Sequence, residues 1–160
     1  MSYAEVLLFL HILGAFLMVA AAGVSTAVGI MAARTSDPRT MVTLLDLQAR
    51  AEWFVMTPGA LIAILFGSLL VDEAGFEFGD SWLTLAYVFW VVALGLDHGV
   101  LIPFNRRLRR RAQGLVDEKV EESAELMAEA GSMRTMLVAL ALDGSLVIFV
   151  YLMVAKPGLS

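Results

Sequence analysis

Four long apolar runs dominate this chain of 160 residues. They lie at about residues 5–33, 51–71, 82–104 and 132–154. Crossing the hydrocarbon core of a bilayer takes about 20 apolar residues in a helix, and each run is long enough. Because backbone groups in lipid must be hydrogen-bonded internally, each run should be α-helical. We therefore expect an all-α, polytopic membrane protein, an antiparallel bundle of four transmembrane helices.

The composition supports this class and excludes several others. Hydrophobic residues make up 59% and charged residues 17% of the chain, against about 45–50% and 25% in soluble domains. We expect residues 1–160 to form one four-span bundle without a separate soluble domain. The first apolar run is longer than the roughly 7–15 residues of a signal peptide core, so it should remain in the mature protein. Since there is no cysteine, disulfides, thiolate metal sites and thiol nucleophiles are excluded.

Basic residues predict the orientation in the cell membrane, because cytoplasmic connections are enriched in Lys and Arg. The connections after the first and third runs hold nearly all of them, whereas the connection at residues 72–80 is purely acidic. We therefore predict that both termini are extracytoplasmic.

The cytoplasmic side should carry a helical extension between the third and fourth spans. Ser36-Asp37-Pro38 is a typical helix start, so the second span should begin before the membrane. After the third span, a basic segment, a turn at Gly114 and an acidic segment at residues 115–130 predict a helical hairpin.

The basic segment of this extension, Arg106 to Arg111, is open to two interpretations. It could bind anionic lipid head groups, or it could simply anchor and orient the span beside it. Nucleic-acid binding is disfavoured because the adjacent glutamates cancel a basic face. The sequence leaves open whether the chain forms a homo-oligomer.

His11 lies in the first span, and three polar side chains on the other spans share its expected depth. Counting about 1.5 Å per helical residue puts His11 about 9 Å below the outer surface, level with Tyr87, Ser68 and Tyr151. His98 is about 15 Å deeper, which disfavours a haem ligated by both histidines. An imidazole with hydroxyl neighbours could ligate a metal or haem, or relay a proton. It could equally be a packing histidine hydrogen-bonded across helices.

Asp97, His98 and Asp143 form a second, deeper group of polar residues. Ionisable residues inside spans are costly and mark functional sites by default. Adjacent helical residues point about 100° apart, so one of Asp97 and His98 is expected to reach Asp143 and the other to reach Arg50 or Glu52. These residues could form a proton path or cation site, or an interhelical tether that fixes packing.

Three short patterns resemble those of a bacterial family of predicted four-span integral membrane proteins. They are the run Leu8-Phe9-Leu10-His11-Ile12-Leu13-Gly14-Ala15, the pair Pro58-Gly59 with Gly67, and Ile102-Pro103-x-Asn105-Arg106-Arg107-Leu108. The chain is also distantly similar to HemJ-type protoporphyrinogen oxidases and to copper-resistance CopD membrane proteins. The HemJ resemblance implies haem binding by the first-span histidine, which is His11 here.

Three functions therefore stay open after the sequence. The first is a haem- or metal-binding, redox-related membrane protein that uses His11. The second is a small proton-coupled transporter that uses Asp97, His98 and Asp143. The third is a non-catalytic membrane module whose buried charges only fix packing. The sequence does not decide whether the protein is an enzyme.

Overall fold

The computed structural model describes residues 2–158, which are helical over most of their length and contain no strand. Two π-helical turns, η1 (Glu52–Met56) and η2 (Asp97–Leu101), join α2 to α3 and α4 to α5. The α-helices are α1 (Tyr3–Ala32), α2 (Pro38–Ala51), α3 (Thr57–Glu73), α4 (Ser81–Leu96), α5 (Ile102–Asp117), α6 (Ala124–Ala130) and α7 (Met133–Ala155). They form four rods that are long and apolar enough to cross a membrane. The expected all-α four-span architecture is confirmed.

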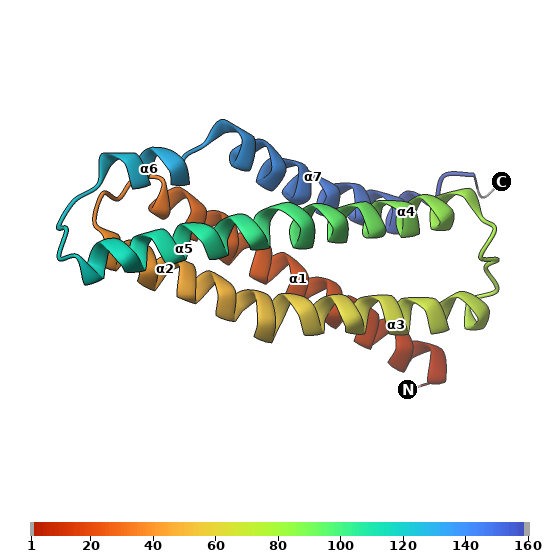
Figure 1. The fold of residues 1–160 in the computed structure, drawn as a ribbon. Coiled ribbons are helices and arrows are strands. Elements are labelled where there is room, and N and C mark those ends of the chain that lie inside the picture. The colour runs from red at the N-terminus through yellow and green to blue at the C-terminus, as the bar shows by residue number, and fades with distance from the viewer. Residues whose placement is uncertain (1, 159–160) are drawn as a thin grey trace.

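The bundle has two chemically different ends (Figure 1). Both chain termini lie at one end, beside the acidic connection at residues 74–80, and we call this the acidic end. The helices α2, α5 and α6 lie at the other, basic end. The rod Pro38–Glu73 has 36 residues, so it is about 54 Å long at 1.5 Å per residue. A hydrocarbon core is only about 30 Å thick, so much of α2 and α5 projects beyond the membrane.

The start of α2 confirms the sequence prediction. Asp37 is the N-cap, and its carboxylate accepts hydrogen bonds from the backbone N–H groups of Arg39 and Thr40. Pro38 occupies the first turn, where a missing N–H costs nothing. Span two therefore begins well before the membrane, as expected.

The predicted turn at Gly114 is wrong. Gly114 lies inside α5, and the chain reverses at residues 118–123, where Lys119 adopts a positive φ of 60°. Packing explains the difference, because Leu108 and Ala112 are buried against α2 and hold α5 in a helix past its basic residues. The Ser123 hydroxyl then caps α6, so the acidic segment is a loop followed by a short helix rather than one continuous arm.

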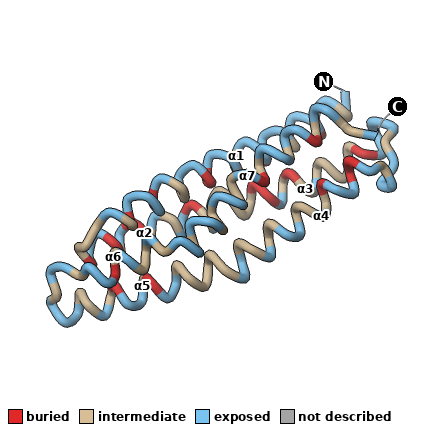
Figure 2. Tube along the Cα trace, turned by 90° about the horizontal axis from the view of Figure 1, so that it is seen from above, coloured by how far each residue is buried: buried red, intermediate tan, exposed pale blue. Residues whose placement is uncertain are grey.

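Two clusters of buried apolar residues lie toward the two ends of the bundle, with further buried positions between them (Figure 2). The cluster at the basic end comprises Val28, Ala32, Met41, Leu44, Leu45, Leu108, Ala112 and Leu126. The cluster at the acidic end comprises Val71, Trp82, Leu83, Ala86 and Leu152. Between them, most large apolar side chains of the spans are exposed and face lipid.

The closest packing joins α1 to α3 through small residues. A Cβ added to Gly14 would lie 2.5 Å from the backbone nitrogen of Ala63 and 2.7 Å from the carbonyl oxygen of Gly59. A Cβ added to Gly67 would lie 2.6 Å from Nδ1 of His11. Small residues at such spacing let helices approach closely within a membrane. This contact holds His11 against the backbone of α3.

Candidate functional site

Each π-helical turn precedes a proline by the same spacing. In η1 the N–H of Thr57 donates to the carbonyl of Glu52, and in η2 the N–H of Ile102 donates to the carbonyl of Asp97. These five-residue steps replace the usual four-residue ones. Pro58 and Pro103 follow immediately; a proline has no N–H and its ring clashes with the preceding turn, so a widened turn relieves both problems. Each proline thus lies six residues after an acidic residue.

The two turns place Glu52 and Asp97 on antiparallel spans, near enough for their charges to interact. Oε1 of Glu52 is buried, and no donor in the part of the chain that the structure describes reaches it. Two ionised carboxylates cannot share such a place, because like charges in a poorly solvated site repel strongly. One proton shared between the two carboxyl groups would relieve this repulsion.

His98 connects this carboxyl pair to its surroundings. Its Nδ1 lies 3.3 Å from Oδ2 of Asp97. The His98 side chain is 55% exposed, whereas that of Asp97 is only 21% exposed. An imidazole can both accept and donate a proton, so His98 is placed to exchange protons with Asp97.

Asp143 belongs to a separate contact. The Thr26 hydroxyl donates to Oδ2 of Asp143 at 2.7 Å, which links α1 to α7. Among residues 2–158, no hydrogen bond or ion pair joins Asp143 to Asp97 or His98. The expectation that one of those two reaches Asp143 is therefore wrong. Asp97 instead lies near Glu52, which was one of the two partners expected on the second span.

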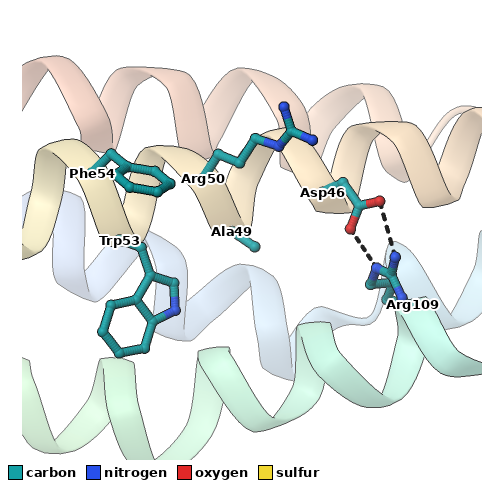
Figure 3. A pocket seen from close by; sticks show the side chains of 6 residues that line it. All are labelled: Asp46, Ala49, Arg50, Trp53, Phe54 and Arg109. Carbon is teal, nitrogen blue, oxygen red and sulfur yellow. Dashed lines mark hydrogen bonds and ion pairs between the residues drawn. The ribbon is translucent and has the colours of Figure 1, made fainter.

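Arg50 lines a surface hollow of about 520 Å³ with Ala49, Trp53, Phe54, Asp46 and Arg109 (Figure 3). In this hollow Arg109 makes a two-pronged ion pair with Asp46, and Nη2 lies 3.0 Å from Oδ2. The hydrogen bond from Arg109 lowers the pKa of Asp46 below its ordinary value, with burial opposing. No ion pair joins Arg50 to Glu52 or Asp97 within the described chain. The structure thus places Arg50 beside the carboxyl pair along the helix but not in contact with it.

The four residues expected at the outer level do not share one network. Nδ1 of His11 lies 2.8 Å from the carbonyl oxygen of Ala63. Because a carbonyl only accepts, Nδ1 carries the hydrogen. The Ser68 hydroxyl donates to the carbonyl of Ile64, so the Tyr87 hydroxyl, 2.7 Å away, donates to Ser68. Tyr151 is 60% exposed on the bundle surface.

Glu52 was the site residue hardest to recognise in the sequence. It lies two residues after Arg50 at the end of a basic region, so it looks like part of a solvated helix start. The repeated spacing of an acidic residue six positions before a proline, in two different spans, is the signal that could have identified it. Within the described residues, no three His, Asp or Glu side chains gather closely enough to hold a metal ion.

Comparison with known proteins gives one match. The model of a family described as "Predicted integral membrane protein (DUF2269)" matches residues 5–157. No curated protein sequence matches the chain, and no solved structure does. The match covers all four spans, both π-helical turns and the extension at the basic end.

Proposed function

The chain belongs to this family of predicted integral membrane proteins, and we propose that it is a small proton-coupled transporter that binds and releases a proton at Glu52 and Asp97. The observation that carries the proposal is the buried Oε1 of Glu52, which has no hydrogen-bond partner among the described residues and lies near the carboxyl group of Asp97 on an antiparallel span. A proton supplies the missing donor.

Two features favour a functional proton over a purely structural one. Both carboxyl groups begin π-helical turns, and such turns are frequent at functional sites. His98 gives Asp97 an exposed neighbour that can exchange protons. A simple tether does not need an exposed imidazole beside it.

We assign Asp143 and Arg50 supporting roles in the same function. Asp143, which accepts a hydrogen bond from Thr26, offers a second carboxyl group that can bind a proton. Helical rise places it about 14 Å from the basic surface, nearer the middle of the membrane. Arg50 places a fixed positive charge two residues before Glu52, where it would assist proton release.

Infrared difference spectroscopy across a pH step tests the proton directly and needs no knowledge of a substrate. The wild-type protein in liposomes should show a carboxylic acid carbonyl band that shifts in heavy water. Glu52→Gln and Asp97→Asn should each remove this band. Asp72→Asn, at the exposed acidic end, is the matched control and should keep it. A band that survives both site variants would overturn the proposal.

The paired amide variant Glu52→Gln with Asp97→Asn separates transport from tethering. An amide pair can still hydrogen-bond across the two helices, so thermal stability should stay close to that of the wild type. Uptake of protons into liposomes with a transported solute present should nevertheless be lost. Unchanged uptake would leave the pair with a packing role only.

Haem binding through His11 is a second candidate, and one observation favours it. Metal-ligating histidines usually donate their other ring N–H to a carbonyl or carboxylate. Nδ1 of His11 does this toward Ala63, so Nε2 keeps a lone pair. His11 could then be the single protein ligand of a haem iron.

The absorption spectrum of the purified protein after haem addition tests this second candidate. A Soret band that is present in the wild type, kept in His98→Ala and lost in His11→Ala would support it. Spectra without any bound-haem band would exclude it without affecting the carboxyl pair.

A further inference from the structure

The arginines of α5 fall into two sets that the sequence does not separate. Arg109 pairs with Asp46, and Arg111 pairs with Glu125 and Glu129. Within residues 2–158, Arg106, Arg107 and Arg110 make no ion pair with a carboxylate. Three of the five arginines in this segment therefore have no ion-pair partner within the described residues.

The three uncompensated arginines share one surface hollow. It has a volume of about 450 Å³ and is lined by Gly99, Pro103, Arg106, Arg107 and Arg110. No acidic side chain lines it. A Cβ added at Gly99 would meet no atom within 4 Å, so the hollow is open beside Gly99.

The position of the hollow matches the boundary between hydrocarbon and head groups. Arg106 lies 24 residues after Trp82, which places it about 36 Å along the rod, just past a core of about 30 Å. On the membrane side, Val88, Val91 and Val92 of α4 are exposed and face lipid. Exposed apolar side chains thus precede the three arginines along the same helical rod.

We propose that Arg106, Arg107 and Arg110, with Gly99 and Pro103, bind the phosphate head group of an anionic phospholipid. Guanidinium groups match phosphate oxygens in charge and in bidentate geometry. Gly99 leaves room for the glycerol backbone, and the apolar surface of α4 accommodates the acyl chains. These residues differ from the carboxyl pair, so this site and the proposed proton function can fail independently.

Lipid titration of the detergent-purified protein tests the site. Native mass spectrometry should show saturable binding of phosphatidylglycerol and much weaker binding of phosphatidylcholine. Replacing Arg106, Arg107 and Arg110 with Gln should weaken phosphatidylglycerol binding about a hundredfold, since each basic residue near a membrane surface contributes roughly fivefold. Equal binding by wild type and this variant would overturn the proposal.

A matched triple variant controls for net charge. Arg34→Gln, Arg39→Gln and Arg134→Gln remove three positive charges without touching the hollow, so phosphatidylglycerol affinity should stay within about twofold of the wild type. A loss equal to that of the site variant would show that charge alone attracts the lipid, against a built site.

Two further arms complete the test. Gly99→Leu fills the hollow without changing charge, and it should weaken phosphatidylglycerol binding while circular dichroism shows an intact helical fold. Inorganic phosphate, added at millimolar concentration, should not displace the lipid. Displacement by phosphate alone would identify a soluble anion as the ligand and refute the lipid assignment.

Discussion

At the scale of single residues, glycines decide how closely α1 and α3 approach. Gly14, Gly59 and Gly67 each have a neighbouring atom within 3.0 Å of where a Cβ would be. The neighbours of Gly14 are backbone atoms, and that of Gly67 is the His11 ring. Hydrogen bonding of His11 to Ala63 depends on the same approach. These glycines therefore position the histidine as well as the helices.

Gly14→Ala should destabilise the protein by about 1–3 kcal/mol, because backbone atoms of α3 have nowhere to move and overpacking forces the helices apart. Unfolding of the purified protein in increasing sodium dodecyl sulfate measures this. Gly23→Ala in the same helix is the control; nothing lies within 4 Å of its added Cβ, so it should be neutral or stabilise by up to about 1 kcal/mol. Equal effects of the two variants would contradict this account of the contact.

Asp46 provides a pH-dependent test at the basic end, outside the membrane. Hydrogen bonding from Arg109 lowers its pKa in the folded state, so its contribution to stability is fully present above the unfolded value of about 3.9. That contribution is lost as the pH falls through the lower folded value. In Asp46→Asn, the loss of stability on acidification below about pH 4 should be smaller than in the wild type.

Unfolding midpoints measured at a series of pH values check this prediction. Arg109→Gln should flatten the same part of the curve, because it removes the group that lowers the pKa of Asp46. Asp46 and Arg109 are both partly exposed, so the effect should be modest and should shrink with added salt. Parallel curves for wild type and Asp46→Asn would rule out the pair as the cause.

At the scale of elements, the two π-helical turns decide which side chains meet. A helix that is regular through residues 97–103 would rotate each later residue about 100° per position. The extra residue in η2 shifts this phase, and η1 does the same on the facing rod. The proximity of Glu52 and Asp97 therefore depends on two local irregularities, each set by a proline.

Pro103→Ala should restore a regular helix, because alanine supplies the missing N–H and removes the ring clash. Asp97 should then turn away from Glu52. We expect the protein to stay helical by circular dichroism and to be no less stable, while the carboxylic acid band in the infrared difference spectrum disappears. Pro58→Ala should behave alike.

Pro157→Ala is the matched control for these variants, because Pro157 lies after α7 and outside any helix. It should leave the infrared band unchanged. If the band also survived in both Pro58→Ala and Pro103→Ala, the π-helical turns would not be what holds the two carboxyl groups together.

At the scale of the whole molecule, the distribution of charge between the ends predicts the topology. The acidic connection and both termini share one end, and the arginines of α2 and α5 occupy the other. Since basic residues favour the cytoplasmic side, the acidic end should face outward.

Cysteine labelling in intact cells can test this orientation with little background, because the chain has no cysteine. Gly79→Cys, in the acidic connection, should react with a membrane-impermeant maleimide added outside. Gln113→Cys, on α5, should react only after the membrane is permeabilised. The reverse pattern would invert the predicted topology.

The residues of the candidate site were only partly predictable from the sequence. Asp97 and His98 were identified as candidates because charged groups inside spans are rare, and Glu52 was identified only as one of two expected partners. The predicted meeting with Asp143 failed, because α7 packs so that Asp143 faces Thr26 of α1. Of the four residues expected at one depth, all of them within the described chain, only Ser68 and Tyr87 are hydrogen-bonded to each other. His11 bonds to Ala63 and Tyr151 lies on the surface, because depth along the membrane normal leaves helix rotation undetermined.

The number of spans, their helical state and the extension at the basic end were all predictable from the order of residues. This is because a bilayer requires long apolar segments whose backbone groups are hydrogen-bonded within the segment. Such segments can be recognised directly in the sequence. The three-dimensional fold was needed to place Glu52 near Asp97 and to show that, within the described residues, three arginines of α5 lack an ion pair while two have one. Both arrangements depend on how each helix is rotated about its axis and on how each π-helical turn changes that rotation. The spacing of apolar residues along the chain does not reveal either rotation.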